Sequence, residues 1–477
     1  MLWICLYLPR LPLDALPETS DAPRLISAAI GNQQRVVVAC ARSQALDVQS
    51  GQTLAAAQAR LPQLQARLRD PQAEAESLRA LAGWAYQFND RIHIHHERRN
   101  ISWRSPQAAI LIETSACLRY HGGLQSLMRR IETLARPMVY EIRLGAAPNC
   151  EGALLMARLK HGAVALDQKN LRQRLARLPL DFLNLPRGMA EKLWRAGVRC
   201  VEQLLALPRE QLARRYGAAP VGYLRRLLGE EAEAHDYYQP PLGYRRLFEL
   251  GSPCSNTEQL QRPIHSMLHE LQGLLGSRDL AAQSLQFELQ HRDRPATVLA
   301  LQLLEASADA THIWGLMRER MHRLQLAAPV EALKLELLQH CPATALQNDL
   351  FEHAQRVKEP WQQVLERLQA RLGRERICAL QQAPDYRPEA ASRYLGFTDL
   401  QPPTDSFQYP ARPLWLLPQP EALPQPPTCL SGPERIEAGW WDQRPVARDY
   451  YIATHASGAR LWVFRRQQQW YLHGYWA

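Results

Sequence analysis

Apolar residues fall in short, dense runs along the first third of the chain. Three of these runs are rich in Leu, Ile and Val and predict buried strands: LWICLYL (2–8), QRVVVAC (34–40) and AAILIET (108–114). Between them, stretches such as LQSLMRRIETLA (124–135) place apolar residues three or four positions apart, which indicates amphipathic helices. The mixture predicts a first domain of strands and helices over residues 1–168.

The next region, residues 169–238, has a helical pattern interrupted by glycines. Two short helices that meet at a glycine turn with basic residues around it are typical of a helix-hairpin-helix, which presents backbone N–H groups to a DNA phosphate. The plain alternative is a helical linker without a ligand. The candidate DNA-binding residues are Gly188, Lys192, Arg195, Gly197, Arg199, Arg214 and Arg215.

Residues 241–342 follow the order strand, helix, strand, strand, helix, strand. The run SLQFELQ (284–290) alternates strictly, so Leu285, Phe287 and Leu289 share one face of the expected strand. This βαββαβ order predicts a sheet with helices on one face and an open second face.

Regularity falls away after residue 342. Residues 343–431 are expected to hold a helix and a proline-rich linker, because a segment so rich in proline stays extended and buries little surface. Residues 432–477 combine turn signals with strand-like runs and predict a small β module. Its aromatic side chains could build a core, stack on single-stranded bases or form a protein-binding surface. They include Trp440, Trp441, Tyr450, Tyr451, Trp462, Trp470 and Tyr471.

The charge balance adds a hint about partners. The 57 Lys and Arg residues outnumber the 47 Asp and Glu residues, which gives a net charge of +10 and a pI near 9.2. A basic excess favours a polyanionic partner, since each neutralised phosphate releases condensed counterions. A solvated basic surface is the plain alternative.

Cysteine usage and the N-terminus indicate the compartment. The nine cysteines are scattered singly without a C-x-x-C pair, which argues against a zinc module and fits reduced thiols. The apolar N-terminus is broken by Pro9, Arg10 and Pro12, so it is interpreted as a buried strand rather than a signal peptide. No apolar run approaches the roughly 20 residues of a membrane span. A soluble cytoplasmic protein is expected.

The order of these parts resembles the Y-family translesion DNA polymerases, in which an α/β palm with fingers precedes a helix-hairpin-helix thumb and a βαββαβ little finger. Within that family the chain is most similar to the ImuB group, the polymerase-like subunits of a bacterial mutagenesis complex. Residues 2–16, 204–217 and 432–477 carry the similarity most specifically. The resemblance covers essentially the whole chain and implies an α+β multidomain fold that ends in a small C-terminal β module.

The resemblance also shows what the palm has lost. A polymerase of this family holds two Mg²⁺ ions with three palm carboxylates, and neutral side chains cannot replace that charge. The first carboxylate falls on Leu6, and the first strand contains no acidic residue, since Asp14 comes too late. The adjacent Asp-Glu pair falls on Ala108 and Ala109 within SPQAAILIETS (105–115). We therefore expect no catalysis, no bound metal and no cofactor.

The nucleotide-binding side departs from the family pattern in the same way. A tyrosine and an arginine of the fingers fall on Ala41 and Gln44, and two lysines that follow the palm fall on Cys150 and Leu154. Each of these changes replaces a stacking or charged group of the family with an uncharged, non-stacking one.

Two short motifs remain. The sequence QNDLF fits the bacterial sliding-clamp pattern Q-x-x-L-F, in which Gln347 makes polar contacts while Leu350 and Phe351 fill an apolar pocket. The run RIHIHHERR (91–99) invites a metal interpretation through its three histidines, but no further ligand cluster accompanies them. An exposed polar strand is the favoured interpretation.

The resemblance implies a non-catalytic adaptor in SOS-induced, error-prone translesion DNA synthesis. Such an adaptor would bind primer-template DNA without sequence preference and would bind the β sliding clamp. It would also recruit an ImuA-like RecA-fold protein and an error-prone C-family DNA polymerase, at the nucleoid in the cytoplasm. Two alternatives stay open: an active Y-family translesion polymerase, and a clamp-independent DNA-binding repair factor.

Overall fold

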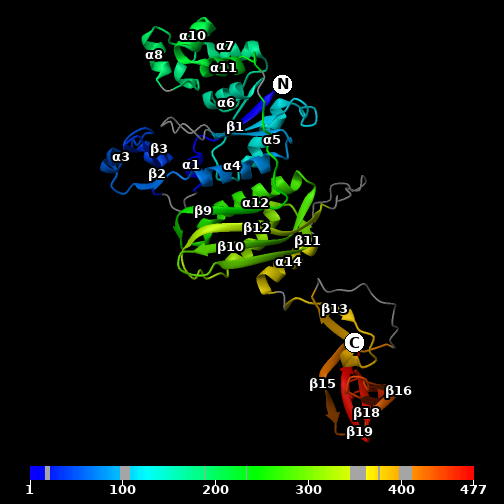
Figure 1. Ribbon diagram of the computed structural model, residues 1–477. Helices are drawn as coiled ribbons and strands as arrows, with labels where there is room; N and C mark the ends of the chain where they lie inside the picture. The colour runs from blue at the N-terminus through cyan, green and yellow to red at the C-terminus, as the bar shows by residue number, and fades with distance from the viewer. Residues whose placement is uncertain are drawn as a thin grey trace. The chain divides into compact units, whose positions relative to one another are not determined.

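The computed structural model describes residues 1–16, 22–96, 108–186, 188–231, 234–343, 361–373, 376–396 and 411–476. The chain forms two compact units, Met1–Gln363 and Val364–Ala477 (Figure 1). Within these described ranges, no helix combines the length and the apolar character that crossing a bilayer requires.

The first unit begins with a five-stranded sheet, here called the palm sheet, in the order β5-β6-β1-β7-β8. Every residue of the two central strands β1 and β6 is buried, which agrees with the continuous apolar runs in the sequence. The strands are β1 (Trp3–Tyr7), β5 (Ile92–His96), β6 (Ala108–Glu113), β7 (Arg143–Ala147) and β8 (Ala163–Val164).

Helices cover the palm sheet. Helix α4 (Pro71–Ala85) packs against β5 and β6, and α6 (Cys150–Leu159) packs against β7 and β1. Gly145 on β7 allows α6 to come this close, because a Cβ at that position would lie 2.7 Å from the Cα of Ala157. Helices α1 (Leu11–Asp14) and α5 (Leu124–Ala135) complete this part of the chain.

A small fingers-like part is inserted between β1 and α4. Its three-stranded sheet has the order β3-β2-β4, and Leu25, Val36 and Val48 belong to a core of its own. Its elements are β2 (Arg24–Ile30), β3 (Gln33–Ala39), α2 (Ala41–Ala45), α3 (Leu54–Arg60) and β4 (Gln65–Leu68).

The helical region that follows, called the thumb, shares a core with the palm. One continuous cluster of buried side chains runs from Tyr7 and Ala109 through α6 to Leu193 and Leu224 of the thumb. The two parts therefore pack as one body. The thumb helices are α7 (Gln168–Ala176), α8 (Met189–Arg195), α9 (Val201–Leu205), α10 (Arg209–Tyr216) and α11 (Ala218–Leu227).

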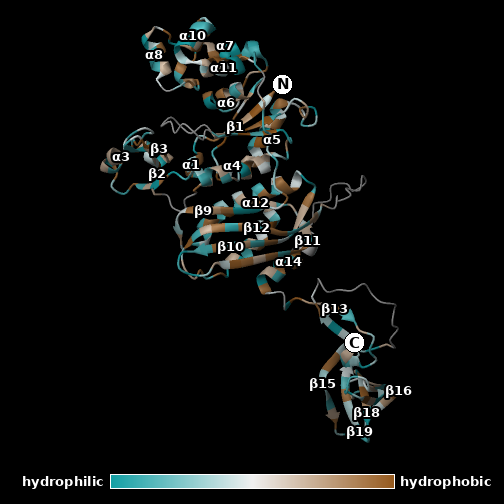
Figure 2. Ribbon diagram, in the orientation of Figure 1, coloured by the Kyte–Doolittle hydropathy of each residue, from teal (hydrophilic) through white to brown (hydrophobic). Residues whose placement is uncertain are grey.

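The little-finger module has the expected βαββαβ order. Its four strands pair in the order β11-β10-β12-β9, and Leu285, Phe287 and Leu289 are all buried on one face, as the alternation predicted. The same alternation is visible as changing hydropathy along these strands in Figure 2. Its elements are β9 (Arg245–Cys254), α12 (Gln261–Gly276), β10 (Leu280–His291), β11 (Thr297–Ser307), α13 (Ala310–Met321) and β12 (Val330–Pro342).

The second unit is built around a five-stranded antiparallel sheet in the order β15-β19-β18-β17-β16. Tyr450 and Trp462 stack at 4.0 Å in its core, whereas Trp440 and Trp441 are exposed. Helix α14 (Trp361–Leu372) spans the boundary between the two units. The strands are β13 (Ala379–Gln382), β14 (Ser392–Leu395), β15 (Trp415–Leu423), β16 (Thr428–Ala438), β17 (Val446–Thr454), β18 (Arg460–Arg466) and β19 (Gln469–Tyr475).

The C-terminal module differs from the sequence-based expectation in where it begins. Residues 415–423 were expected to lie in a proline-rich linker, but they form β15 and pair with β19. An edge strand tolerates Pro418 and Pro420 because one side of it needs no N–H donors, and the pairing register shifts between Leu416 and Glu421. The sheet thus starts earlier than residue 432.

Candidate functional site

The three expected carboxylate positions lie at the centre of the palm sheet. Leu6 lies in β1, and Ala108 and Ala109 open β6. Their exposed fractions are 1%, 0% and 0%. Side chains at these positions are therefore part of a packed core, and none of them offers an oxygen that could bind Mg²⁺. The metal that the family resemblance implies does not fit these residues.

The register of the strands shows how these positions face. Ala109 lies opposite Tyr7, and Leu6 lies opposite Ile110. Tyr7 and Ala109 belong to the core shared with α6 and the thumb. Because neighbouring residues of a strand point to opposite faces, Leu6 and Ala108 face away from that core. The sequence-based prediction did not identify Tyr7 as the neighbour of Ala109, because the register between two strands cannot be derived from the sequence of one strand alone.

The buried carboxylates of this region are each held by protein groups. Glu74 of α4 receives two hydrogen bonds from Arg69, at 2.6 and 2.7 Å, and lies 3.4 Å from His96. Burial opposes ionisation of Glu74, but these hydrogen bonds outweigh it and lower its pKa.

Glu113 and Asp14 are engaged elsewhere. Glu113 lies at the far end of β6, opposite Trp3, and accepts a hydrogen bond from the backbone N–H of Ser115 at 3.0 Å. Burial raises the pKa of Asp14 to about 6, against the backbone N–H of Glu141 and the charge of Arg10. Among the residues that the structure describes, no three His, Cys, Asp or Glu side chains are placed to hold a metal.

The three histidines of β5 are half-buried, rather than exposed as expected. His93 lies 5.0 Å from the ring of His235, and His96 contacts Glu74, so these two already have protein neighbours. Burial, together with the charges of His93 and His96, lowers the pKa of His95 to about 4. His95 is therefore neutral at neutral pH.

Three of the four positions expected to have lost nucleotide contacts make internal contacts, and Ala41 is exposed. The Gln44 amide donates to the backbone oxygen of Ala39 at 2.8 Å, next to Ala41 at the start of α2. Cys150 opens α6 with its sulfur 3.5 Å from Nε2 of His235, and Leu154 is buried in the shared core. These groups support packing.

The thumb presents its candidate DNA-binding residues at the surface. Gly188 caps α8 and Gly197 ends the following turn, and both have positive φ angles, 75° and 89°, which glycine adopts at little cost. Lys192, Arg195, Arg199, Arg214 and Arg215 are exposed.

Trp194 is a thumb residue that the sequence-based prediction missed. The residue is 55% exposed, and the guanidinium of Arg199 lies 4.1 Å from the centroid of its ring. The sequence did contain a signal for Trp194, because it is an aromatic residue at an otherwise polar position of a short basic helix. Stacked Arg and Trp side chains can contact nucleic-acid bases and backbone.

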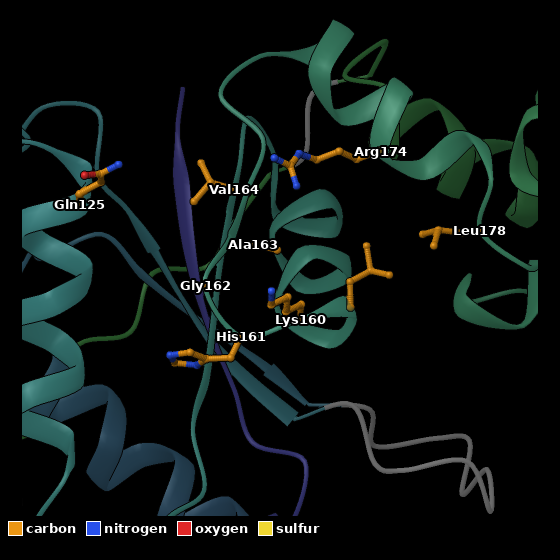
Figure 3. Close-up of a pocket in the computed structure, with 9 residues that line it drawn as sticks. Gln125, Lys160, His161, Gly162, Ala163, Val164, Arg174 and Leu178 are labelled. Carbon is orange, nitrogen blue, oxygen red and sulfur yellow. The ribbon is translucent and has the colours of Figure 1, made fainter.

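A shallow pocket lies beside the junction of palm and thumb (Figure 3). Its volume is about 550 Å³, and Lys160 and Arg174 reach it from the end of α6 and from α7. His161 also lines it and lies 3.6 Å from Glu132. The clamp motif with Gln347, Leu350 and Phe351 lies outside the described residues.

Comparisons with known proteins agree with the sequence-based resemblance. No protein-family model matches the chain. Protein ImuB of two Caulobacter vibrioides strains (NA1000 / CB15N and ATCC 19089 / CIP 103742 / CB 15) is 26% identical over 460 residues, which cover 89% of this chain and 98% of that protein.

Solved structures of DNA polymerases are also matched. The crystal structure of DinB from Sulfolobus solfataricus matches at 15% identity with a TM-score of 0.38, covering 72% of this chain and 100% of the other. A post-insertion binary complex of Dbh DNA polymerase matches at 14% identity with a TM-score of 0.39, covering 71% and 98%. The α+β fold class with several sheets is confirmed by the structure, and along 89% of its length this chain is similar to Protein ImuB.

Proposed function

We propose that this chain is a non-catalytic, Y-family polymerase-like adaptor in SOS-induced, error-prone translesion DNA synthesis. The observation that carries the proposal is the state of Leu6, Ala108 and Ala109, which are fully buried apolar residues in the centre of the palm sheet. A two-metal site needs several carboxylate oxygens that face one solvent-accessible point. The similarity to Protein ImuB supports the same conclusion.

DNA binding is assigned mainly to the thumb. Its exposed Lys192, Arg214 and Arg215 lie on short helices whose ends can face phosphates. The open face of the little-finger sheet contributes less, because Lys334 is held 2.8 Å from Glu288 and 2.9 Å from Glu336. The two carboxylates offset the positive charge of Lys334, so this lysine attracts a phosphate only weakly. Binding through the thumb would depend on salt and not on sequence.

The protein partners follow from the resemblance and from one motif. We assign binding of the β sliding clamp to Gln347, Leu350 and Phe351, and recruitment of an ImuA-like RecA-fold protein and an error-prone C-family polymerase to the C-terminal region. The adaptor would work in the cytoplasm, at the nucleoid. Exposed Trp440 and Trp441 are side chains of the kind that anchor protein interfaces.

Primer extension tests the non-catalytic assignment. Purified chain, primer-template DNA, Mg²⁺ and all four nucleotides are incubated with an active Y-family polymerase as the positive control. We expect no template-dependent incorporation by the chain alone. Incorporation that survives further purification would support the alternative of an active polymerase.

A clamp pull-down tests the adaptor assignment separately. The wild type is compared with the double variant Gln347→Ala, Phe351→Ala on immobilised clamp. We expect retention of the wild type and loss of the variant. Equal retention of both, or of neither, would favour a clamp-independent DNA-binding factor.

A further inference from the structure

The little-finger module packs against the palm through a close crossing of α12 and α4. Gly273 of α12 faces Trp84 of α4, and a Cβ at Gly273 would lie 2.9 Å from the backbone oxygen of Trp84. Gly83 of α4 faces Leu274, where a Cβ would lie 3.8 Å from the side chain. The two helices therefore meet at small residues that allow their backbones to approach.

A buried polar cluster lies beside this crossing. Arg246 of β9 donates to the Ser77 hydroxyl of α4 at 2.9 Å, and lies 3.2 Å from the Tyr140 hydroxyl in the palm. Glu270 of α12 accepts from Tyr140 at 3.0 Å and from Tyr244 at 3.3 Å. The cluster thus joins two elements of the little finger to two segments of the palm.

Arg246 and Glu270 are buried as a charged pair at 3.3 Å, with exposed fractions of 4% and 0%. A buried charge is tolerated only where every neighbouring group offers a matching hydrogen bond. If the module docked elsewhere on the palm, the pair would lose its hydrogen bonds to Ser77 and Tyr140. The cluster therefore favours one docked position over any other.

The segment that links thumb and little finger is bound on both sides. The backbone N–H of Tyr238 donates to the oxygen of Ile92 on β5 at 2.7 Å. Arg278 of the little finger donates to the backbone oxygens of Pro240 at 2.7 Å and Leu242 at 3.1 Å. Residues 238–242 of the linking segment are therefore held both by the palm and by the little finger.

We propose that these contacts lock the little-finger module on the palm in a single position, so that palm, thumb and little finger form one rigid platform. Ser77 and Tyr140 are the palm side of the lock, Arg246 and Glu270 are its little-finger side, and Gly273 sets the helix crossing. The geometry between the thumb and the open sheet face is then fixed before any ligand binds. This inference does not depend on the proposed function.

Two glycines of α12 give a matched test. Gly273→Ala places a methyl group against Trp84, whereas Gly276→Ala on the same helix meets nothing within 4 Å. The full chain is digested briefly with chymotrypsin, and cleavage after Tyr237 and Tyr238 in the linking segment is followed by mass spectrometry. We expect Gly273→Ala to be cut there at least about tenfold faster than the wild type, and Gly276→Ala at the wild-type rate.

A second variant avoids any damage to the little finger itself. Ser77→Ala with Tyr140→Phe removes the palm hydroxyls and leaves the Arg246–Glu270 pair and the α12 sequence intact. We expect faster cleavage after Tyr237 and Tyr238 here as well, with unchanged cleavage after Phe287 in the central strand β10. Tyr223→Phe, which removes a buried thumb hydroxyl near Asn184, is the control and should behave as wild type.

The wild type alone can also overturn the proposal. If its linking segment is cut as fast as in the variants, the module is not locked. Equal effects of Gly273→Ala and Gly276→Ala, or wild-type cleavage of the Ser77→Ala, Tyr140→Phe variant, would contradict the assigned contacts.

Discussion

The palm sheet and the little-finger sheet both contain a strand, helix, strand, strand, helix, strand series, to which the palm adds the fingers-like insertion, α6 and β8, but they bury their strands differently. In the palm sheet the first strand, β1, lies near the centre, and every residue of β1 and β6 is buried. In the little finger the first strand, β9, is an edge, and β10 alternates between buried and partly exposed residues. The comparison shows that the palm positions serve packing, while the little finger keeps one polar face.

The largest difference in stability between the two sheets should appear when an aspartate is introduced into each of them. Ala109→Asp puts a carboxylate in a fully buried site, whereas Ala300→Asp puts one on the exposed face of β11. We expect Ala109→Asp to lower the free energy of unfolding by about 4 kcal/mol, and Ala300→Asp to change it by less than about 1 kcal/mol. Urea unfolding of both variants measures this, and equal effects would contradict the assignment of Ala109 to the core.

A smaller effect separates the two faces of β10. Leu285→Ala removes a fully buried side chain, and Gln286→Ala changes its neighbour on the open face. We expect a loss of about 3 kcal/mol for Leu285→Ala and a change within about 0.5 kcal/mol for Gln286→Ala. Thermal unfolding provides the measurement, and a reversed order would mean that the sheet faces are assigned the wrong way round.

The pH dependence of stability should show the lowered pKa of His95. The pKa of His95 is lowered to about 4 in the folded state, so the unfolded chain binds more protons between pH 6.5 and 4. Stability from the neutral ring is present above pH 6.5 and is lost as the pH falls through this range.

Between pH 7 and pH 5 this loss should be about 2 kcal/mol. His95→Gln should reduce the pH dependence by that amount, as measured by urea unfolding at the two values. An identical pH dependence in wild type and variant would show that His95 is already solvated.

The smallest effect concerns DNA. Arg214→Ala with Arg215→Ala removes two exposed thumb cations, and Lys334→Ala removes the paired lysine of the little-finger face. We expect the double variant to weaken duplex binding and to reduce the slope of log affinity against log salt by about 2. Lys334→Ala should leave both quantities unchanged. Fluorescence anisotropy over a series of salt concentrations measures both quantities. A larger effect of Lys334→Ala than of the double variant would indicate that DNA binds to the open face of the little-finger sheet.

Much of the fold could be predicted because the pattern of apolar and polar residues along a strand indicates which of its faces are buried. The apolar runs at 2–8 and 108–112 predicted buried strands, and strict alternation at 284–290 predicted one open face. The order of strands could not be predicted, because similar series of elements place β1 at the centre of one sheet and β9 at the edge of the other. Pairing depends on contacts between distant segments.

The candidate site was predictable only in part. The apolar identity of Leu6, Ala108 and Ala109 is plain in the sequence, but the pairing of Ala109 with Tyr7 depends on register. The palm–little-finger cluster left a signal that was overlooked: in YRRLFEL, Arg246 has the same parity as the buried Phe248. A charged residue at a core-facing position needs partners, and two of them, Ser77 and Tyr140, lie 169 and 106 residues away in the sequence.

Leu6, Ala108 and Ala109 are assigned to a packed core in place of a two-metal site. Binding of Mn²⁺, followed by electron paramagnetic resonance in the presence of primer-template DNA and a non-hydrolysable nucleotide, tests this assignment most directly. We expect no stoichiometric Mn²⁺ binding beyond that of DNA and nucleotide alone, in the wild type and in Ala109→Ser alike. Two tightly bound Mn²⁺ ions per chain would contradict the assignment.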